Sequence, residues 1–374
     1  MKIGIEAQRI FRKNKHGMDF VVLEYIRALQ QIDKVNLYYI FAAPGEDEVL
    51  TDSDNFKIIK VGMPLYPLWE QIALPLAVKR VNPDILHCTS NTAPLILKTP
   101  LILTIHDVIY LEKRNSTNKS IYQNLGWYYR KFIVPLVAAK AKKILTVSAF
   151  EMDRISSALN LSSDKVDFIY NSFSTHFYYR EGHYKVTSKY LSDREYLFFL
   201  GNTDPKKNTE RVLMAYSKFI RKTGLKIPLL IADLDEKYVR DILVKLKISD
   251  IFPLLRMPGY IPNRDLPYIY SGATLFLYVS LRESFGIPQL EAMACETPVI
   301  TSNTSAMPEI AGDAAVYADP FNIDSIESAI NEVITNNELQ KAMKEKGLNR
   351  TKEFSWVKSS EKLLNIYNDI VSND

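Results

Sequence analysis

The segment 274–291 reads TLFLYVSLRESFGIPQLE and gives the clearest indication of the fold class. Its apolar run at 274–279 predicts a short buried strand. Gly286 then permits a tight turn, and Pro288 suits the first turn of a helix, where its missing N–H leaves no hydrogen bond unmade. A strand that passes through a tight turn into a helix is the building unit of a parallel α/β sheet.

The same alternation of short apolar runs and amphipathic stretches extends along the whole chain. In the first half, we expect strands at 2–5, 37–41, 56–61, 85–88, 101–105, 144–147 and 166–169. In the second half, we expect them at 196–200, 228–232, 274–279, 298–301 and 315–317. Apolar residues at helical spacing predict helices that include 20–32, 121–140, 209–222 and 357–371.

The alternation of strands and helices stops once and then starts again. Residues 173–195 are polar and aromatic without a clear period, so they are predicted to form a linker. A chain of 374 residues is also too long for one compact core. The sequence therefore predicts an α/β protein with two Rossmann-like domains whose parallel sheets face each other across a cleft. The expected domains are 1–172 and 196–355, and a final helix at 356–374 is expected to cross back to the N-terminal domain.

Composition places the chain among ordinary globular proteins. Hydrophobic residues make up 47% and charged residues 24%, which argues against extensive disorder. Cys88 and Cys295 lie in different halves and match no metal-binding or redox spacing, which favours a reducing compartment. The start MKIGIEAQRIF has too short an apolar stretch for a signal peptide, and no apolar run reaches the length of a membrane span. We therefore expect a soluble, cytoplasmic protein.

Positive charge is concentrated in the first half of the chain. The formal net charge is +4; residues 1–190 hold 25 Lys/Arg and 18 Asp/Glu, or +7, and residues 191–374 hold 22 and 25, or −3. Residues 122–131 interleave Tyr and Trp with Arg130 and Lys131, a pattern found at membrane interfaces. Peripheral contact with the anionic inner face of a membrane is one hypothesis, and a solvated surface is the alternative. We expect no nucleic-acid partner.

Two acidic residues flank the turn in the opening segment. Glu283 follows the strand, and Glu291 lies one turn into the helix. Open parallel sheets bind ligands beyond the carboxyl ends of their strands, and the free N–H groups of a helix start attract phosphate. Glu291 suits paired hydrogen bonds from ribose hydroxyls, and Glu283 is placed to meet a sugar hydroxyl or the charge that develops at the anomeric carbon. The alternative is that both acids only offset the helix dipole.

A basic turn follows another expected strand. The segment 201–208 reads GNTDPKKN, and Lys206 and Lys207 lie just before a helix start, where two ammonium groups can hold a diphosphate. Asn208 is expected to cap that helix. The alternative is an exposed basic turn without a ligand.

The segment 257–264, MPGYIPNR, is a third candidate. Its backbone and the ring of Tyr260 are placed to meet a nucleobase, and the alternative is a plain strand-ending turn. Asp233-Leu-Asp235 looks like a metal-binding Asp-x-Asp sequence, but we do not favour a metal there.

Residues 196–320 resemble the donor-binding half of the retaining GT-B glycosyltransferases, specifically glycosyltransferase family 4. The resemblance rests on YLFFLGNTDPKKNTERVLMAYSKF and on GYIPNRDLPYIYSGATLFLYVSLRESFGIPQLEAMACETPVITSNTSAMPEIAGDAAVYADP. The second stretch contains the family's pair of acids seven residues apart, here Glu283 and Glu291. The resemblance continues less tightly over residues 3–170, in RIFRKNKHGMDFVVLEYIRAL, PDILHCTSNTAP, LILTIHDVIYL and KKILTVSAF.

The resemblance implies an enzyme of GT-B architecture that takes a hexose from a nucleotide-diphosphate sugar, either GDP-mannose or a UDP-sugar. The acceptor would be a sugar or a lipid-linked glycan, and the anomeric configuration would be retained. By analogy, the pathway would be surface polysaccharide biosynthesis. No metal and no cofactor beyond the nucleotide sugar is expected.

The resemblance also implies a role for individual residues. Donor-binding roles fall on Gly17, Asn202, Lys206, Lys207, Tyr260, Ile261, Glu283, Ser284, Phe285, Gly286, Ile287 and Glu291. Acceptor-binding roles fall on His106, Asp107 and Ser148, and catalytic roles on Glu283, His106 and Lys207. The chain departs from the family at Lys206, which is usually arginine, at Asn202 and Thr203, where some relatives have arginine, and at Glu296, which is usually glycine.

Other functions fit the same residues in part. A nicotinamide-dependent dehydrogenase needs Gly-x-Gly-x-x-Gly after the first strand, and GIEAQR lacks it. An epimerase or a phosphorylase of GT-B architecture stays open as an alternative. A sugar-nucleotide-binding protein without turnover is the non-enzymatic alternative.

Overall fold

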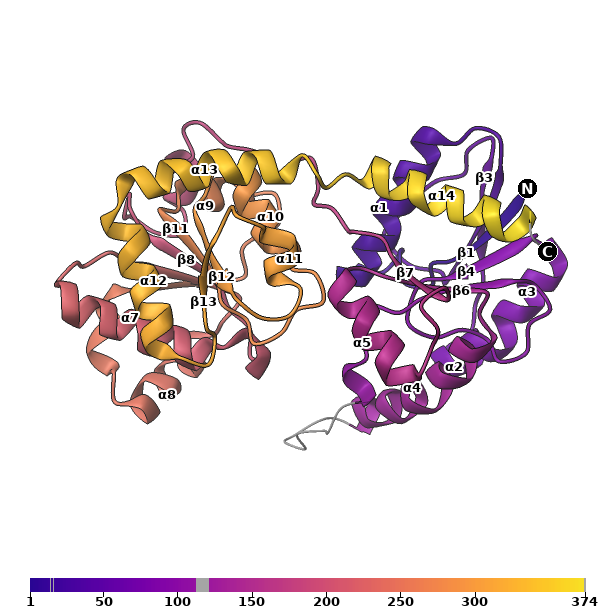
Figure 1. The fold of residues 1–374 in the computed structure, drawn as a ribbon, viewed down its shortest axis with the longest axis horizontal. Helices are drawn as coiled ribbons and strands as arrows, with labels where there is room; N and C mark the ends of the chain where they lie inside the picture. The colour runs from indigo at the N-terminus through magenta and orange to yellow at the C-terminus, as the bar shows by residue number, and fades with distance from the viewer. Residues whose placement is uncertain (14, 16, 112–120, 373–374) are drawn as a thin grey trace. The chain divides into compact units, whose positions relative to one another are not determined.

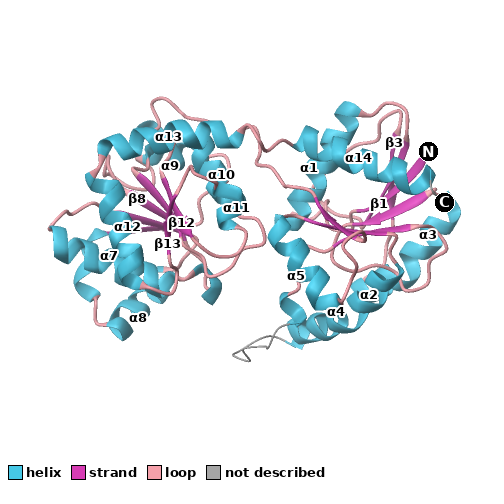
Figure 2. Ribbon diagram, viewed as in Figure 1, coloured by secondary structure: helices cyan, strands magenta, loops and turns pink. Residues whose placement is uncertain are grey.

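The computed structural model describes residues 1–13, 15, 17–111 and 121–372, which form two compact units (Figure 1). The first unit contains Met1–Asn171 together with Trp356–Asp374, and the second contains Ser172–Ser355. Each unit has its own parallel sheet with helices on both faces (Figure 2). Among the described helices, none combines the length and the apolar character needed to cross a bilayer.

The first unit is built on a seven-stranded sheet in the order β3-β2-β1-β4-β5-β6-β7. Its strands are β1 (Lys2–Glu6), β2 (Leu37–Ala42), β3 (Phe56–Lys60), β4 (Ile85–Cys88), β5 (Leu101–Thr104), β6 (Lys143–Thr146) and β7 (Val166–Phe168). Its helices are α1 (Gly17–Ile32), α2 (Tyr66–Leu68), the π-helix η1 (Trp69–Ala73), α3 (Leu74–Val81), the 3-10 helix η2 (Ile109–Leu111), α4 (Ile121–Lys140), α5 (Ala149–Leu159) and α14 (Trp356–Ser372). Buried apolar side chains pack α1 and α14 on one face and α3 and α4 on the other.

The second unit is built on a six-stranded sheet in the order β10-β9-β8-β11-β12-β13. Its strands are β8 (Leu197–Leu200), β9 (Leu229–Ala232), β10 (Leu255–Gly259), β11 (Leu275–Tyr278), β12 (Val299–Ser302) and β13 (Val316–Ala318). Its helices are α6 (Tyr184–Thr187), η3 (Pro205–Lys207), α7 (Thr209–Thr223), α8 (Glu236–Leu246), η4 (Ser249–Leu254), α9 (Leu266–Gly272), α10 (Ile287–Ala294), α11 (Met307–Ala311), α12 (Ile323–Thr335) and α13 (Asn337–Thr351). The central strand β11 is apolar throughout because helices cover both faces of the sheet.

The strand order of each sheet reverses at one point. In the first sheet the chain moves outward from β1 to β3 and then resumes on the other side of β1 with β4. In the second sheet the same reversal lies between β8 and β11. Loops that follow the two strands at such a switch point diverge to opposite faces and leave a crevice where ligands of doubly wound folds bind.

The structure contains the expected strands, and none of their ends shifts by more than one residue. The sequence does not predict β10, because that segment contains Pro258 and Gly259, which are poor residues for a strand. The strand is tolerated because it lies at the edge of the sheet, where it pairs only with β9.

Residues 173–195, expected to be a linker, belong to the second unit instead. Phe177 is 3% exposed, and its ring packs edge-on against Tyr270 with the centroids 6.0 Å apart. The hydroxyl of Tyr190 donates a hydrogen bond to Asp265 at 2.6 Å. The aromatic residues that break the sequence periodicity therefore anchor this segment to the domain.

The helix α14 lies in the first unit, although it follows the second unit in the sequence. Ser359 donates a hydrogen bond to the carbonyl of Tyr170 at 2.6 Å. The hydroxyl of Tyr367 lies 2.6 Å from Nδ1 of His87, which belongs to β4. The chain therefore crosses between the units twice, at residues 171–172 and 355–356.

Candidate active site

The carboxyl ends of β8 and β11 bring two polar segments of the second unit together. The two strands are direct neighbours, with Leu197 opposite Leu275. The N–H of Leu281, after β11, donates a hydrogen bond to the carbonyl of Lys206, after β8, at 2.7 Å. The two loops are thus fixed to each other at the switch point of this sheet.

Asn208 connects the same loops in a way that the sequence does not predict. It precedes α7, but its backbone is left-handed (φ 64°) and its side chain makes no cap hydrogen bond. Its Nδ2 donates instead to the carbonyls of Val279 at 3.0 Å and Pro320 at 2.7 Å. The expected N-cap is therefore wrong, because two strand-end carbonyls take the amide that would otherwise lie at the helix start.

Lys207 and Glu283 form an ion pair where these strands end. Nζ of Lys207 lies 2.6 Å from Oε1 of Glu283, and the two side chains are only 18% and 13% exposed. Lys207 also lies over the ring of Tyr278, 5.2 Å from its centroid. Burial alone would raise the pKa of Glu283, but the charges of Lys207 and Lys206 outweigh it and lower the pKa. The carboxylate is therefore ionised at neutral pH.

The turn from this ion pair into α10 depends on one glycine. Gly286 has a φ of 94°, which L side chains resist, and it directly precedes the first helical residue, Ile287. Ser284 and Ile287 are half-buried. Phe285 is buried and its ring packs against Phe354, with centroids 5.9 Å apart. A ligand at this turn would therefore meet the backbone of Phe285 and not its ring.

Glu291 lies one turn into α10. The hydroxyl of Tyr270 donates to its Oε2 at 3.3 Å and is the one hydrogen-bond donor to this carboxyl among the described residues. Burial raises the pKa of Glu291 to about 7. The carboxyl is therefore close to half ionised at neutral pH, and a ligand that supplies hydroxyl donors would favour the ionised form.

The remaining donor-site candidates lie at the same edge of the sheet but are less enclosed. Asn202 turns its side chain back on its own loop, where Oδ1 accepts the N–H of Asp204 at 2.8 Å. Tyr260 is 75% exposed after β10, whereas Ile261 is buried. Because β9 separates β10 from β8, Tyr260 lies two strands away from the ion pair.

The Asp-x-Asp sequence has a structural explanation. Asp235 caps α8 by accepting the N–H groups of Lys237 at 2.8 Å and Tyr238 at 3.3 Å. Asp233 has a left-handed backbone (φ 61°) in the turn after β9. Across residues 1–13, 15, 17–111 and 121–372, no group of three His, Cys, Asp or Glu side chains is arranged to hold a metal ion.

In the first unit, His106 follows β5 and is 7% exposed. Its Nε2 lies 3.0 Å from the carbonyl oxygen of Thr89, and since a carbonyl only accepts, Nε2 must carry the proton. Burial lowers the pKa of His106, so the ring is neutral at pH 7. The unprotonated Nδ1 is then the hydrogen-bond acceptor of this imidazole.

The other N-terminal candidates differ in their surroundings. Oδ1 of the half-buried Asp107 accepts the N–H of Ile109 at 3.0 Å. Ser148 caps α5 by accepting the N–H of Glu151 at 3.2 Å, and it is fully buried, which argues against direct contact with an acceptor. Gly17 begins α1, and no described atom lies within 4 Å of the position that a Cβ would occupy. There is therefore room for a ligand beside its backbone.

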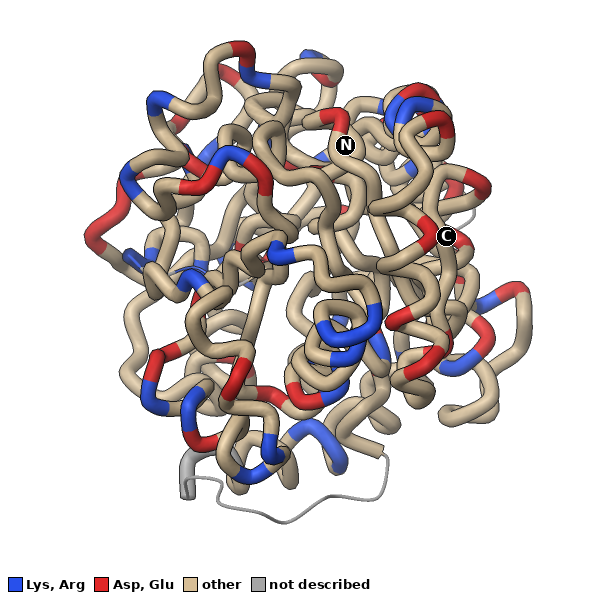
Figure 3. The backbone as a smooth tube through the Cα atoms, turned by 90° about the vertical axis from the view of Figure 1, so that its left-hand side faces the viewer, with Lys and Arg blue, Asp and Glu red and all other residues tan. Residues whose placement is uncertain are grey.

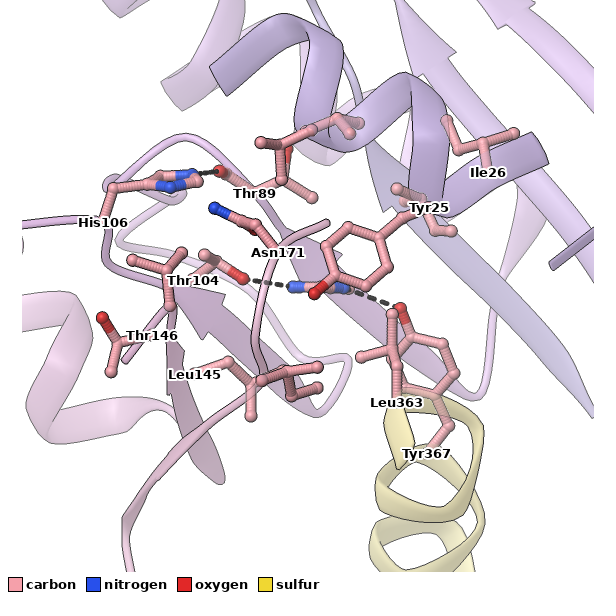
Figure 4. Close-up of a pocket in the computed structure, with 16 residues that line it drawn as sticks. Tyr25, Ile26, Thr89, Thr104, His106, Leu145, Thr146, Asn171, Leu363 and Tyr367 are labelled. Carbon is pink, nitrogen blue, oxygen red and sulfur yellow. Dashed lines mark hydrogen bonds between the residues drawn. The ribbon is translucent and has the colours of Figure 1, made fainter. Parts of the chain in front are cut away.

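A small cavity in the first unit is lined by His106 and His87 (Figure 4). Its volume is about 30 Å³, enough for about one water molecule and too small for a sugar ring. Thr146 and Asn171 also line the cavity. Neither Oγ1 of Thr146 nor Oδ1 of Asn171 has a hydrogen-bond partner among the described residues. The cavity therefore suits an internal water and not a substrate.

Among the buried acids of the first unit that sequence reasoning missed are Glu6 and Glu70, each 1% exposed. Glu6 occupies the last position of β1, and an acid at the carboxyl end of an apolar strand is a signal that could have found it. Glu70 lies in the π-helix η1, where the helical period is interrupted, so the sequence offers no comparable signal.

Two family descriptions match the chain over both units. Residues 16–177 match Glycosyltransferase Family 4, and residues 185–350 match Glycosyl transferases group 1.

Several relatives carry names of mannosyltransferases. The chain is 33% identical over 231 residues to O-antigen chain mannosyltransferase B of Escherichia coli, a match that covers 61% of this chain and 60% of that protein. It is 26% identical to O-antigen chain mannosyltransferase RfbU of Salmonella typhimurium, covering 72% and 69%. It is 25% identical to the serotype-specific mannosyltransferase WbdA of Escherichia coli, covering 84% and 41%. The chain thus spans less than two thirds of mannosyltransferase B and less than half of WbdA.

Solved structures of similar fold cover the whole chain. Sucrose-phosphate synthase from Thermosynechococcus elongatus has a TM-score of 0.77 at 16% identity over 100% of both chains. Anabaena HepE in complex with UDP-glucose has a TM-score of 0.74 at 16% identity, covering 99% of this chain and 100% of that one. WaaG, a glycosyltransferase involved in lipopolysaccharide biosynthesis, has a TM-score of 0.73 at 13% identity, covering 97% and 99%. Because the family matches cover both units and the fold agrees, the chain belongs to family 4 of the GT-B glycosyltransferases.

Proposed function

We propose that this chain transfers mannose, or another hexose, from a nucleotide-diphosphate sugar to a glycan or lipid-linked acceptor in surface polysaccharide synthesis. The single observation that carries the proposal is the Lys207–Glu283 ion pair, 2.6 Å long, at the switch point beside the start of α10. The names of the O-antigen mannosyltransferases favour mannose, with GDP-mannose as the expected donor. The complex of HepE with UDP-glucose keeps a UDP-sugar open as the other donor.

The proposed chemistry centres on the departing diphosphate. The bond between the anomeric carbon and the diphosphate breaks, and the acceptor oxygen bonds to the same face of the sugar, so that configuration is retained. The acceptor's proton passes to the diphosphate oxygen that leaves. Lys207 has three N–H donors; among the residues that the structure describes, Glu283 engages one, so that two are left for phosphate oxygens. Charge stabilisation by Lys207 and the start of α10 would supply most of the catalysis, without a metal.

Two further residues complete the proposed site. Glu291 accepts hydrogen bonds from the ribose hydroxyls of the nucleotide, which is consistent with its raised pKa and its scarcity of donors. His106 accepts a hydrogen bond from an acceptor hydroxyl at Nδ1, consistent with its neutral ring and Nε2–H tautomer.

A nucleotide screen followed by a product assay tests the proposal. GDP-mannose or a UDP-sugar is expected to raise the melting temperature, because a ligand that binds only the native state stabilises it in proportion to RT ln(1 + [L]/Kd). Octyl mannoside is then added as acceptor, and both nucleoside diphosphate and a longer glycoside are expected. Interconversion of sugars without nucleotide release would indicate an epimerase, and sugar phosphate formed from a glycan and phosphate would indicate a phosphorylase. Binding of the nucleotide sugar without formation of any product would indicate a sugar-nucleotide-binding protein without turnover.

Donor affinity is expected to fall as the pH is lowered through about 7. The pKa of Glu291 is raised from 4.5 to about 7, so below that pH its carboxyl is protonated and cannot accept two hydrogen bonds. Each further pH unit then costs up to roughly tenfold in affinity.

The same raised pKa affects the stability of the protein without donor. Between pH 4.5 and 7 the carboxyl of Glu291 is protonated in the folded state but ionised in the unfolded state. Its contribution to the free energy of unfolding is therefore largest at the acid end of that window and is lost as the pH rises through 7.

Calorimetric titration with GDP-mannose between pH 6 and 8 measures this dependence. GDP-mannose is chosen because its diphosphate is substituted at both ends and does not titrate near neutrality. Glu291→Gln is the matched control and should remove the dependence. An affinity that is flat with pH in the wild-type chain would contradict the assignment of Glu291 to the ribose.

We also propose that the first unit contacts an anionic membrane, and that two exposed stripes form the contact. One stripe runs along α4, and the other along α2, η1 and α3; their members are spaced at three and four residues and are 41–67% exposed. We call these eight residues the apolar surface: Leu65, Leu68, Ile72, Leu76, Leu125, Tyr128, Phe132 and Leu136. Tyr129 joins the two stripes, because its hydroxyl accepts a hydrogen bond from Gln71 at 2.8 Å and donates one to Glu70. Exposed apolar patches on adjacent helices mark interaction sites.

The charge around the apolar surface favours an anionic bilayer. The twenty residues of α4 include three basic residues and no acidic residue, whereas basic and acidic residues are interspersed along most of the chain (Figure 3). Past the end of this stripe, Lys98, Lys140 and Lys142 help line a pocket of about 290 Å³. Apolar side chains at the acyl boundary with lysines at headgroup level are typical of peripheral membrane proteins.

Replacing Leu125 and Phe132 together with serine is expected to reduce binding to phosphatidylglycerol vesicles by more than about tenfold. Burying a Leu or Phe side chain stabilises an apolar contact by about 1.5–3 kcal/mol. Co-sedimentation at low salt measures the binding. Leu225→Ser with Val244→Ser is the control, because these apolar residues are exposed in the second unit. The proposed membrane contact would be contradicted if the wild-type chain did not bind these vesicles. It would also be contradicted if the control pair lost as much binding as the Leu125 and Phe132 double variant.

A further inference from the structure

Three neighbouring strands of the first sheet end in residues that contact one another. Glu6 ends β1, Thr89 directly follows β4, and His106 lies just after β5. These strands are adjacent in the order β1-β4-β5, and Glu6 pairs in register with Cys88. The contacts therefore cross the switch point of this sheet, where a ligand is expected.

Glu6 clamps the loop after β4. Its Oε2 accepts the N–H of Thr89 at 3.2 Å, and its backbone carbonyl accepts the Thr89 hydroxyl at 2.7 Å. Its other carboxylate oxygen, Oε1, accepts the N–H of Gln8 at 2.9 Å. Since both oxygens are engaged, the carboxylate fixes the loop after β4 to the loop after β1.

The clamped loop in turn holds His106 at two points. The carbonyl of Thr89 accepts Nε2–H of the ring at 3.0 Å. The side chain of Asn91 accepts the backbone N–H of His106 at 2.6 Å, and Asn91 itself has a left-handed backbone (φ 69°). Both the position of His106 and its tautomer therefore depend on residues 89–91.

This arrangement is costly for the fold. Glu6 is 1% exposed; burial raises its pKa, and the nearby Glu70 carboxylate raises it further. Glu70 is buried as well, but it is supplied with donors such as Tyr66 at 2.7 Å and Gln71 at 2.9 Å. If the site required only shape, an apolar side chain would fill the position of Glu6 at a lower free-energy cost.

We propose that Glu6 is a positioning residue for His106: through Thr89 it holds the imidazole as the Nε2–H tautomer, so that Nδ1 accepts a hydrogen bond from the acceptor hydroxyl. The effect on turnover rests on the role proposed above for His106. The tautomer itself does not, and it can be measured in the absence of any substrate.

Nitrogen-15 NMR of histidine-labelled protein at pH 8 tests the proposal. The chain has five histidines, and the His106 signals are those that vanish in His106→Gln. We expect one neutral tautomer protonated at Nε2. In Glu6→Gln one carboxylate oxygen is replaced by a donor NH₂ group. One of the two hydrogen bonds that this carboxylate accepts from the N–H groups of Gln8 and Thr89 is then lost, and a second tautomer of His106 should appear. The kcat for GDP-mannose and octyl mannoside should fall about ten- to a hundredfold, with the donor KM nearly unchanged.

Asp33→Asn is the matched control. Asp33 is a buried carboxylate of the same unit that also accepts two backbone N–H groups, from Val35 at 2.8 Å and Asn36 at 3.1 Å. It should change neither the His106 signals nor kcat.

Either of two results would overturn the proposal: a wild-type His106 protonated at Nδ1, or a Glu6→Gln variant with an unaltered tautomer. If Glu6→Gln does not fold, Thr89→Val removes the hydroxyl link while it keeps the carbonyl, and a second tautomer is expected there too; an unaltered tautomer in that variant would likewise contradict the proposal. A chain without transferase activity would refute the proposed function, yet the tautomer would still decide the role of Glu6.

Discussion

Lys207→Ala is expected to lower kcat by about a hundredfold to a thousandfold, with a smaller effect on the donor KM. The ammonium of Lys207 would stabilise charge on the departing diphosphate, which develops fully only as the bond breaks. The substitution also removes the cation that lowers the pKa of the buried Glu283 most, so that the pKa of this carboxyl should rise. Initial rates of GDP release from GDP-mannose with octyl mannoside measure the effect.

The second unit offers a matched control for this substitution. Lys222 lies 3.1 Å from Glu327, which is 2% exposed, so it too pairs with a buried glutamate. It belongs to α7, away from the switch point, and Lys222→Ala should leave kcat within about twofold of the wild-type value. Similar rates for the wild-type chain and Lys207→Ala would show that the ion pair has no part in turnover.

Glu291→Gln is expected to weaken nucleotide binding by about ten- to a hundredfold. A hydrogen bond to a charged group contributes about 1.5–3 kcal/mol, and the amide cannot accept from two ribose hydroxyls with both of its atoms. Titration calorimetry with GDP at pH 8 measures this loss, since Glu291 is then mostly ionised in the wild-type chain.

Glu327→Gln is the control for that experiment. Glu327 is another buried glutamate of the second unit, and it binds Lys222 instead of facing the switch point. Its replacement should leave the Kd for GDP unchanged. Wild-type affinity for GDP in Glu291→Gln, or an equal loss of affinity in both variants, would contradict the proposal that Glu291 binds the ribose.

The fold was predictable because buried strands and buried helix faces have recognisable patterns of apolar residues in the sequence. Strands covered on both faces must be apolar throughout, as in LFLY of β11, and the helices between them repeat their apolar residues at helical spacing. Residues 173–195 show no such pattern, because Phe177 packs on Tyr270 from an irregular segment in which apolar residues have no regular spacing. The strand β10 was obscured by Pro258 and Gly259.

The location of the candidate site was predictable, but its contacts were not. Topology alone places the loops after β8 and β11 together, because adjacent parallel strands end at the same edge. The ion pair of Lys207 with Glu283 joins residues that lie 76 positions apart, and local sequence carries no information about that distance. Asn208 shows the same limit: its type suits a helix cap, and only the folded chain reveals the two carbonyls that it binds.

The return of α14 to the first unit means that this unit is built from both ends of the chain. A protease that cuts at 171–172 would make residues 1–171 a separate polypeptide. That fragment would stay attached to the second unit only through the packing of α14, which includes the hydrogen bonds of Ser359 with Tyr170 and of Tyr367 with His87.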